Sequence, residues 1–336
     1  MIICKIPLRI SYFGGGTDFP EWYLNNKGMV ISTAINKYCY MTMRYLPPFF
    51  PFKYRIRYFR TEFTKNIDQI KHPSIREVLK KYHKNISGLE IIHSSDLPSR
   101  SGLGSSSAFS VALIKGIETM NNKRSSNFLI AKKAIKLEQD ILKEKVGSQD
   151  QIACAVGGFN IIDFRKNIKI NNYKIKYQKI KILEKLSTLI YIGQVRDAQE
   201  IETDKINNLK INSKLFKIIY EIADEAKKII ISKNNKSFIE NISGLMNESW
   251  NAKKQLSEKV SNRKIDHLYD FALNNGALSG KILGAGAGGF MLFLSKNFRE
   301  KQKLINLLNK KKIKHVNFNF EENGASIIFQ NKSDYV

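Results

Sequence analysis

Residues Leu97 to Ala108 read Leu-Pro-Ser-Arg-Ser-Gly-Leu-Gly-Ser-Ser-Ser-Ala, and this serine loop (residues 97–108) joins a predicted strand to a predicted helix. β-favouring residues 89–93 precede it, and apolar residues recur at helical spacing over 105–120. Gly102 and Gly104 permit positive φ, which lets the backbone approach a ligand closely. The serines that follow would place hydroxyls and free N–H groups at a helix N-terminus, where an anion binds favourably. The pattern predicts a loop that holds a polyphosphate.

Two well-known nucleotide-binding loops do not fit this stretch. A Walker A loop requires Gly-Lys followed by Ser or Thr, and a dinucleotide fingerprint requires Gly-x-Gly-x-x-Gly. Neither pattern is present in the serine loop. A glycine- and serine-rich loop that only caps a helix, without any ligand, is the alternative interpretation.

Length and composition exclude several classes of protein. The 336 residues suffice for two domains, and 43% hydrophobic with 11% aromatic residues exclude a disordered chain. Cys4, Cys39 and Cys154 lie far apart, so a disulfide framework or zinc site is not expected and a reducing compartment fits. The N-terminal apolar run is too short for a signal peptide, and no segment approaches the length of a membrane span. We therefore expect a cytoplasmic protein with no membrane contact.

The charge balance is strongly positive, because 56 Lys and Arg against 30 Asp and Glu give a formal net charge of +26. Such a balance can indicate nucleic-acid binding. The lysines are spread along the chain, however, and the sequence contains no Arg-rich arm, zinc finger or RNP-like aromatic strand. We expect solvated lysine faces, or a positive field that attracts anionic substrates, and no nucleic-acid partner.

The order of predicted elements indicates an α+β protein of two domains. In the first half, strands are expected at residues 2–10, 29–35, 38–45, 54–59, 89–93, 159–163 and, rich in lysine, near 168–181, with helices at 74–83, 105–120 and 126–143. The second half is expected to hold strands at 186–192, 281–283, 289–294, 316–320 and 325–329, with helices at 213–231, 235–256, 263–274 and 299–311. The boundary is placed near 182–186, which divides the chain into residues 1–184 and 185–336.

A second glycine-rich motif lies near the N-terminus, where residues 7–18 read Pro-Leu-Arg-Ile-Ser-Tyr-Phe-Gly-Gly-Gly-Thr-Asp. Arg9 would project from a strand, and the three glycines would bring backbone N–H groups close to a ligand. Asp18 offers a carboxylate that can accept two hydrogen bonds from sugar hydroxyls. An ordinary glycine-rich hairpin turn closed by Asp is the alternative.

Two further features complete the set of motifs. Glu138 is expected late in a helix, and Asp150 in the loop that follows it, within Val-Gly-Ser-Gln-Asp-Gln at residues 146–151. Solvated carboxylates paired with nearby lysines are the alternative for this pair. Residues 281–290 read Lys-Ile-Leu-Gly-Ala-Gly-Ala-Gly-Gly-Phe, which by itself predicts a glycine-rich turn before a strand.

Together these four motifs resemble those of the GHMP small-molecule kinases, which include galactokinase, homoserine kinase, mevalonate kinase and phosphomevalonate kinase. Pro-x-x-x-Gly-Leu-Gly-Ser-Ser is the long signature of that superfamily, and the motifs stand here in the family's order. The resemblance implies ATP as phosphoryl donor and Mg²⁺ as the metal. It also implies a ribosomal S5 domain 2-like N-terminal domain and a ferredoxin-like α+β C-terminal domain, and it leaves room for a homodimer.

The resemblance assigns roles residue by residue. The nucleotide would contact Pro98, Ser101, Gly102, Leu103, Gly104, Ser105, Ser106 and Ser107. Ser106 and Glu138 would hold Mg²⁺, and Asp150 would be the catalytic carboxylate, stabilised by Arg9. The sugar would contact Arg9, Gly14, Gly15, Gly16, Thr17, Asp18, Asp150 and Arg196. The C-terminal motif would support the serine loop through Gly284, Gly286 and Gly288.

Within the superfamily, Gly-Gly-Gly-Thr-Asp at residues 14–18, Gly-Ser-Gln-Asp-Gln at 147–151 and Ala-Val-Gly-Gly-Phe-Asn at 155–160 resemble the kinases of D-glycero-D-manno-heptose 7-phosphate. Residues 192–198 are similar to that subgroup's Thr-Gly-x-x-Arg-x-Ala, although Ile192 replaces Thr. Arg196 would then meet the sugar phosphate, and a surface arginine at a strand end is its alternative.

The implied reaction is ATP-dependent phosphorylation of the anomeric C1 hydroxyl, which gives the 1,7-bisphosphate for nucleotide-activated heptose and surface polysaccharide synthesis. Two alternatives stay open. One is a kinase of the same superfamily that acts on an unphosphorylated hexose or deoxyhexose, such as galactose or fucose. The other is a basic RNA-binding protein, because the N-terminal fold of these kinases resembles a domain of ribosomal proteins.

Overall fold

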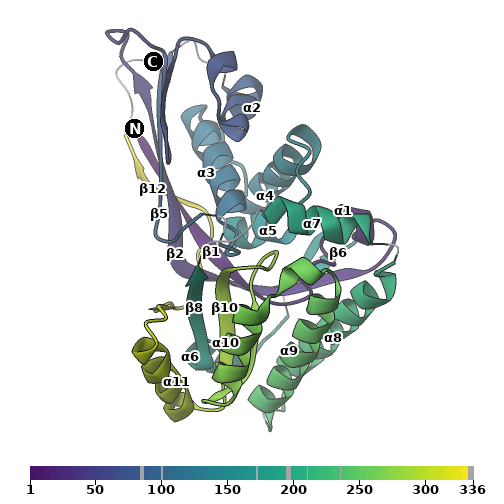
Figure 1. Ribbon diagram of the computed structural model, residues 1–336. Helices are drawn as coiled ribbons and strands as arrows, with labels where there is room; N and C mark the ends of the chain where they lie inside the picture. Colours follow the sequence, from purple (N-terminus) through teal and green to yellow (C-terminus); the bar gives the residue numbers. More distant parts are fainter. Residues whose placement is uncertain are drawn as a thin grey trace.

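The protein is described by a computed structural model that covers residues 1–83, 87–99, 101–171, 173–193, 198–209, 211–234 and 236–331. Two β-sheets with helices packed on them make up the fold (Figure 1). The predicted α+β class is therefore confirmed. Within the described residues, no helix combines the length and the apolar character needed to cross a membrane.

The first sheet has eight strands and is built around β1 (Ile2–Phe13) and β2 (Gly28–Leu46), which pair antiparallel. Buried and half-buried residues alternate at the start of β1, whereas every residue from Ile6 to Phe13 is buried. Continuous burial is expected where both faces of a strand are covered. The other strands are β3 (Tyr54–Arg57), β4 (Thr61–Thr64), β5 (Gly88–Ser95), β6 (Phe159–Phe164), β7 (Lys169–Asn171) and, from the far end of the chain, β12 (Ser326–Gln330).

Helices cover one face of this sheet, and α3 (Ser105–Met120) is the central one. Twelve of its sixteen residues are buried, because it lies between β1 and β2 on one side and other helices on the other. Its neighbours are α2 (Pro73–Tyr82), α4 (Asn127–Ile135) and α5 (Gln149–Val156). A π-helical segment, Lys136–Ile141, directly continues α4, while α1 (Pro20–Tyr23) and a 3-10 turn at Ile67–Gln69 are short.

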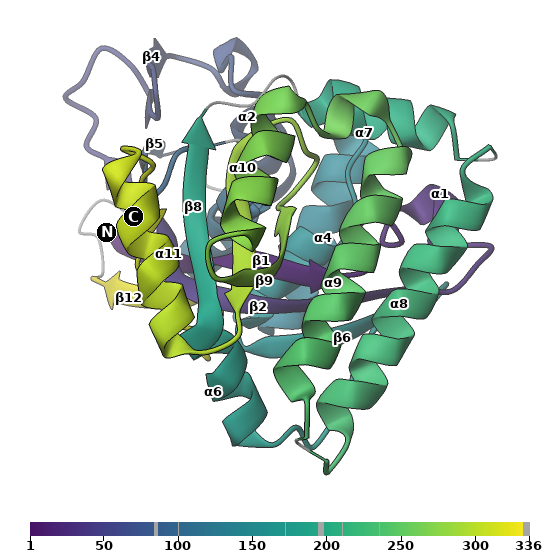
Figure 2. The same ribbon diagram turned by 60° about the horizontal axis from the view of Figure 1, so that its bottom comes forward.

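The second sheet has four strands in the order β11-β8-β10-β9. Its strands are β8 (Ser187–Gly193), β9 (Ala277–Ile282), β10 (Gly289–Ser295) and β11 (His315–Val316). The helices of this half are α6 (Tyr177–Leu186), α7 (Ala198–Asn207), α8 (Ser213–Ile231), α9 (Phe238–Gln255), α10 (Arg263–Leu273) and α11 (Phe298–Lys310), with a 3-10 turn at Glu258–Val260. Figure 2 shows α9, α10 and α11 packed around these strands.

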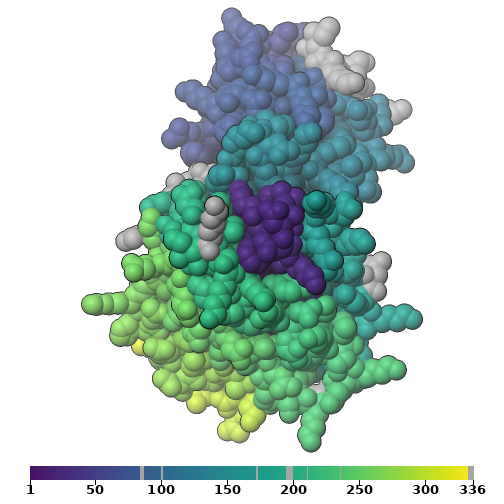
Figure 3. Space-filling view, turned by 90° about the vertical axis from the view of Figure 1, so that its right-hand side faces the viewer, coloured from purple at the N-terminus to yellow at the C-terminus, as the bar shows by residue number. Residues whose placement is uncertain are grey.

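Segments far apart in the sequence join the two sheets. Trp22 of α1 stacks on Phe216 of α8 with ring centroids 5.2 Å apart, and α8 also packs on β1 and β2. In Figure 3 the purple N-terminal segment lies at the surface between teal and green parts of the chain. β12 follows the second sheet in sequence but pairs antiparallel with β1 in the first sheet. The division at residue 184 stays a prediction.

Four expectations about local structure were wrong. Of the strand expected at 316–320, only Val316 belongs to a strand, and Phe320 forms an isolated bridge with Ile35. The separate strands at 29–35 and 38–45 form the single strand β2, with a register shift opposite Pro7 and Leu8 that accommodates Asn36 and Lys37. Residues 177–181, expected as strand, begin helix α6, whose buried Lys179, Leu183 and Leu186 recur at helical spacing. Residues 149–156, expected as loop at Asp150, form helix α5.

Candidate active site

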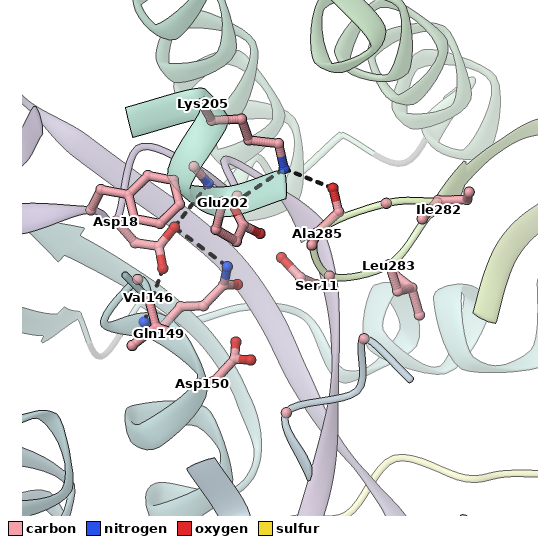
Figure 4. Close-up of a pocket in the computed structure, with 18 of the residues that line it drawn as sticks. Ser11, Asp18, Val146, Gln149, Asp150, Glu202, Lys205, Ile282, Leu283 and Ala285 are labelled. Atoms are coloured by element: carbon pink, nitrogen blue, oxygen red, sulfur yellow. Dashed lines mark hydrogen bonds and ion pairs between the residues drawn. The ribbon is translucent and has the colours of Figure 1, made fainter. Parts of the chain in front are cut away.

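A cavity of about 280 Å³ lies where the two halves of the chain meet. Its walls come from β1 and the turn that follows it, the serine loop, α5, α7, α9 and the turn between β9 and β10. Figure 4 shows side chains from both halves directed into this space, among them Asp18, Asp150 and Lys205. The cavity therefore brings together the four motifs that the sequence singled out.

The serine loop begins α3 in the way its glycines suggest. Gly104, the residue before the first turn, has φ +76°, and Gly102 has φ +82°. These values lie in the left-handed region that glycine adopts without a steric penalty. The backbone N–H of Arg9 donates to the carbonyl of Leu103 at 3.0 Å, which ties the loop to β1. Ser105 and Ser106 at the start of α3 line the cavity, and the N-terminus of a helix suits a phosphate group.

The glycine-rich turn between β9 and β10 packs backbone to backbone on the serine loop. A Cβ atom on Gly102 would lie 2.4 Å from the carbonyl oxygen of Leu283, and one on Gly284 would lie 2.4 Å from Cα of Gly102. A Cβ on Gly289 would lie 2.3 Å from the carbonyl oxygen of Ser101. Only glycine fits these positions, because heavier side chains would separate the two loops.

Arg9 and Asp150 form a bidentate ion pair at the edge of the cavity. Nε of Arg9 donates to Oδ1 of Asp150 at 2.7 Å, and a terminal nitrogen donates to Oδ2 at 2.6 Å. The other terminal nitrogen of Arg9 donates to the carbonyl of Gly102 at 2.6 Å. Arg9 is almost completely buried, whereas the Asp150 side chain is 25% exposed. The guanidinium thus fixes a carboxylate that still reaches the cavity, beside the serine loop.

The donors that hold Asp18 within the described part of the chain are N–H groups. Its Oδ1 accepts from the backbone N–H of Gly16 at 2.9 Å, and its Oδ2 accepts from the backbone N–H of Gln149 at 3.1 Å (Figure 4). Burial, with a smaller contribution from the charge of Asp150, raises the pKa of Asp18 to about 6. Gly147 is required beside it, because a Cβ there would lie 1.9 Å from Oδ2. The carboxylate oxygens keep lone pairs for hydroxyl donors of a ligand.

Glu138 lies in the π-helical segment, where the extra residue per turn displaces the side chain from a regular α-helical position. Its Oε2 accepts from Ser107 Oγ at 3.1 Å and from Gln151 Nε2 at 2.5 Å. Its Oε1 is buried and has no hydrogen-bond partner among the residues that the structure describes. Burial raises the pKa of Glu138 to about 7, against the opposing effect of the side chains of Ser110, Gln151 and Ser107. A cation beside Oε1 would stabilise the carboxylate.

Three buried lysines line the cavity from the C-terminal half. Lys205 of α7 donates to the carbonyl of Ala285 at 2.7 Å, and Lys281 of β9 donates to the carbonyl of Tyr12 at 2.8 Å. Lys253 of α9 donates to the carbonyls of Ile282 at 3.1 Å and Gly284 at 2.5 Å. Burial and the charge of Arg9 lower the pKa of Lys281 to about 7. We call these residues the lysine cluster.

Most of the residues predicted for the site line this one cavity. They are Arg9, Gly15, Gly16, Asp18, Gly102, Gly104, Ser105, Ser106, Ser107, Glu138, Asp150, Gly284, Gly286 and Gly288. The lining does not include Pro98, Ser101, Leu103, Gly14 and Thr17. The hydroxyl of Thr17 is occupied by backbone, since it donates to the carbonyl of Gly14 at 2.8 Å and accepts from the N–H of Met29 at 3.0 Å. Arg196 lies outside the described residues.

Sequence reasoning did not select several residues that line the cavity. Ser11, Gln149 and Lys281 lie inside motifs that were recognised, so their position in these motifs could have identified them as site residues. Lys205 is the one lysine of α7, and Lys253 stands beside Lys254 in α9. Nothing in their local sequence distinguishes them from the other lysines and arginines among the 56 basic residues of the chain. Only the tertiary structure brings their ammonium groups to the cavity.

Comparison with known proteins agrees with this geometry. Residues 70–158 match the description "GHMP kinases N terminal domain", and residues 230–314 match "GHMP kinases C terminal". The chain is 32% identical to D-glycero-alpha-D-manno-heptose 7-phosphate kinase of Campylobacter jejuni, over 96% of this chain and 97% of that protein. It is 25% identical to the bifunctional fucokinase/GDP-fucose pyrophosphorylase of Arabidopsis thaliana, over 89% of this chain but 30% of that one.

A solved structure shares the whole architecture. The crystal structure of a D-glycero-D-manno-heptose 1-phosphate kinase from Bacteroides thetaiotaomicron superposes with a TM-score of 0.79, at 22% identity, and covers 99% of this chain and 100% of its own. The two sheets and their helices are thus the two-domain GHMP arrangement that the motifs implied. The chain belongs to the GHMP kinases, and it is a sugar kinase that uses ATP to phosphorylate an alcohol group.

Proposed function

We propose that this kinase transfers the γ-phosphoryl group of ATP to the anomeric C1 hydroxyl of D-glycero-D-manno-heptose 7-phosphate, giving the 1,7-bisphosphate and ADP. The observation that carries the proposal is the presence of Asp18, Asp150 and the serine loop around one cavity. Asp18 is suited to bind sugar hydroxyls, and Asp150 is suited to act on the reacting hydroxyl. The N–H groups of the serine loop are suited to bind phosphates, and all three line the same cavity. The 32% identity to the heptose 7-phosphate kinase of Campylobacter jejuni supports the choice of sugar.

Asp150 would act on the reacting hydroxyl. The C1 oxygen forms a bond to the γ-phosphorus while the bond from that phosphorus to the β,γ-bridging oxygen breaks, and ADP leaves. The hydroxyl proton passes to Asp150, whose two oxygens are oriented by Arg9. An anomeric hydroxyl is more acidic than an ordinary alcohol, so a carboxylate suffices as the acceptor. Rate enhancement would then come mainly from alignment and from electrostatic stabilisation of the phosphates.

Glu138 and Ser106 fit the requirements of a magnesium ion. Both line the cavity, and Oε1 of Glu138 is a buried carboxylate oxygen with no hydrogen-bond partner in the described part of the chain. Mg²⁺ prefers hard oxygen ligands and retains several waters, so a carboxylate and a hydroxyl are sufficient protein ligands. The ion would offset the negative charge of the ATP phosphates. Ser107 would not bind the ion itself. Its hydroxyl donates to the Glu138 carboxylate and orients it.

The proposal includes a cellular setting. The 1,7-bisphosphate carries the anomeric phosphate from which a nucleotide-activated heptose for surface polysaccharide can be made after removal of the other phosphate. Because the reaction consumes ATP, we place it in the cytoplasm.

A substrate panel tests the proposal. ADP release would be measured with heptose 7-phosphate, mannose 6-phosphate, fucose, galactose and no sugar. We expect the highest kcat/KM for heptose 7-phosphate, and a loss of roughly 100-fold, about 2.7 kcal/mol, when the 7-phosphate is removed. Added salt should weaken binding of the phosphorylated substrate more than binding of the neutral one, because salt screens charge pairs.

The second candidate is a kinase of an unphosphorylated deoxyhexose, which the 25% identity to the fucokinase of Arabidopsis thaliana favours. Equal kcat/KM for phosphorylated and free sugars would select that candidate and reject heptose 7-phosphate.

A further inference from the structure

The lysine cluster is built from three elements that meet only in the folded chain. Lys205, Lys253 and Lys281 come from α7, α9 and β9, and their exposed fractions are 3%, 8% and 4%. Their ammonium groups are anchored to backbone carbonyls of the β9–β10 turn and of Tyr12. An ammonium ion has three N–H donors, so each lysine keeps donors for a ligand in the cavity that all three line.

Positive charge exceeds negative charge around Lys253. Burial, followed by the charges of Lys205 and Lys281, lowers the pKa of Lys253, and the charges of Glu202 and Arg9 also act on it. Arg9 is paired with Asp150, and Lys205 lies 3.3 Å from Glu202, whereas Lys253 and Lys281 donate to backbone carbonyls. Burial lowers the pKa of Lys281 to about 7, and when all four cations are protonated they exceed the carboxylates of Glu202 and Asp150 by two charges. Burial of cations without counter-charges is unfavourable, and a phosphate monoester, with about −1.5 to −2 charges near neutral pH, would offset them.

Ser11 marks the space between the lysine cluster and the reacting end of the site. Its hydroxyl is buried, lines the cavity and has no hydrogen-bond partner within the described ranges. In Figure 4 Ser11 lies between the ammonium group of Lys205 and the carboxylate of Asp150, with Asp18 to one side. A sugar with its reacting hydroxyl at Asp150 would thus contact Asp18 and Ser11 and extend its other end toward Lys205 and Lys253.

The phosphates of ATP have a different set of donors. The serine loop and the start of α3 supply backbone N–H groups and hydroxyls, and Glu138 stands beside them for a metal ion. The lysine cluster comes from the C-terminal half and approaches the cavity from the β9–β10 turn. Both groups suit phosphate, and in Figure 4 Lys205 of the cluster lies across Ser11 from Asp150.

We propose that Lys205, Lys253 and Lys281 bind the phosphate at the non-reacting end of the sugar substrate. This inference rests on the proposed function, because it assumes that the sugar carries such a phosphate. The cluster would bind phosphorylated sugars selectively, and the energy of that contact would help to place the distant hydroxyl at the γ-phosphate.

Kinetics of lysine variants test the assignment. kcat/KM would be measured for heptose 7-phosphate and for free heptose in the wild type, Lys253→Met and Lys205→Met. Methionine keeps the length of the side chain and removes its charge. We expect kcat/KM for the phosphorylated sugar to fall by roughly 30-fold or more, as for other truncated buried charge pairs, while the value for free heptose changes by less than about 3-fold. KM for ATP should also stay within about 3-fold of wild type.

Lys254→Met is the matched control. Lys254 is the next residue of α9, but it is partly exposed and lies 3.5 Å from Asp266, away from the cavity lining. Its substitution should leave both kcat/KM values unchanged. If the Lys253 variant raises KM for ATP and leaves the sugar phosphate unaffected, the cluster binds nucleotide phosphates and the assignment is overturned. Equal losses for phosphorylated and free heptose would also overturn it.

A binding measurement on the wild-type protein covers the case in which a variant does not fold. Inorganic phosphate should compete with heptose 7-phosphate and leave KM for ATP unchanged, whereas competition with ATP alone would contradict the assignment. Titration calorimetry with mannose 6-phosphate, without ATP, separates this proposal from the proposed function. Failure of heptose 7-phosphate as a substrate would reject the function, while tight, Lys253-dependent binding of mannose 6-phosphate would still support the cluster. Absence of any phosphate binding would reject the cluster alone.

Discussion

Arg9 and Asp150 are 141 positions apart in the sequence, yet their side chains form two hydrogen bonds, at 2.7 and 2.6 Å. The contact joins β1 to the first turn of α5, and the same guanidinium also holds the carbonyl of Gly102 in the serine loop. One buried arginine therefore sets the position of the carboxylate predicted to act in catalysis relative to the loop predicted for the nucleotide. Most of the expectations about catalysis depend on this contact.

Asp150→Asn should remove most of the turnover, by roughly 100-fold or more, because an amide cannot accept the hydroxyl proton. Binding of a non-hydrolysable ATP analogue should survive, since Asp150 would act on the sugar. Asp270→Asn, a change at an exposed site on α10, is the control and should be silent. ADP release and analogue affinity would be measured for both. Turnover within a few-fold of wild type would exclude Asp150 from the chemistry.

Glu138→Gln should raise the magnesium concentration needed for half-maximal activity, because an amide oxygen is a weaker ligand than a carboxylate. Ser106→Ala should act in the same direction. Ser107→Ala tests whether Ser107 orients Glu138, since it removes the 3.1 Å hydrogen bond to Glu138 and leaves both predicted metal ligands in place. We expect a smaller effect from it than from Ser106→Ala. Magnesium titrations of Glu138→Gln and Ser106→Ala that overlay the wild type would disprove the metal assignment.

KM for the sugar should rise as the pH falls through about 6, the value to which burial raises the pKa of Asp18. Protonation removes the acceptor that sugar hydroxyls would use, so it weakens binding of the sugar more than the chemical step. The phosphate of the substrate itself titrates near pH 6, so free heptose would be measured in parallel. Asp18→Asn should have a high KM that no longer depends on pH in this range. A constant wild-type KM for free heptose between about pH 5 and pH 8 would refute the role of Asp18.

Gly284→Ala should disrupt the site, because its Cβ would lie 2.4 Å from Cα of Gly102 and its φ is +66°. We expect a loss of about 1–3 kcal/mol in the free energy of unfolding, and a larger KM for ATP as the serine loop is displaced. Gly244→Ala is the matched control on α9, where a Cβ would meet nothing within 4 Å. The free energy of unfolding of that variant should rise by about 0.5–1 kcal/mol, because alanine has a higher helix propensity than glycine. Urea denaturation and ATP kinetics would check both.

Sequence patterns predicted the elements that carry strong local signals. The helix expected at residues 105–120 is α3 with the same bounds, because left-handed glycines precede it and apolar residues recur along it. The helix expected at 213–231 is likewise α8. The residues of the serine loop, of the N-terminal motif and of the C-terminal glycine-rich turn meet at one cavity as the order of the motifs suggested. The roles given to them stay predictions.

Tertiary packing determines several local structures and the burial of several side chains that local sequence patterns did not predict. Alternating Ile and Lys near residue 180 suggested a strand, but burial of Leu183 and Leu186 against the core favours the helix α6. The π-helical turn at Glu138 has no local signal. Lys205, Lys253 and Lys281 resemble the other lysines of the chain until the fold buries their ammonium groups. Arg196, which was selected for the sugar phosphate, lies outside the described residues, and its assignment stays a prediction.

Phosphorus NMR of the product tests the central claim most directly. Purified enzyme, ATP, magnesium and D-glycero-D-manno-heptose 7-phosphate would be incubated, and the sugar product examined. We predict ADP in equal amount to a bisphosphate whose new phosphorus signal couples to the anomeric proton, and whose reducing end no longer reacts with borohydride. A new phosphate on any other carbon, or a product that keeps its reducing end, would contradict phosphorylation at C1.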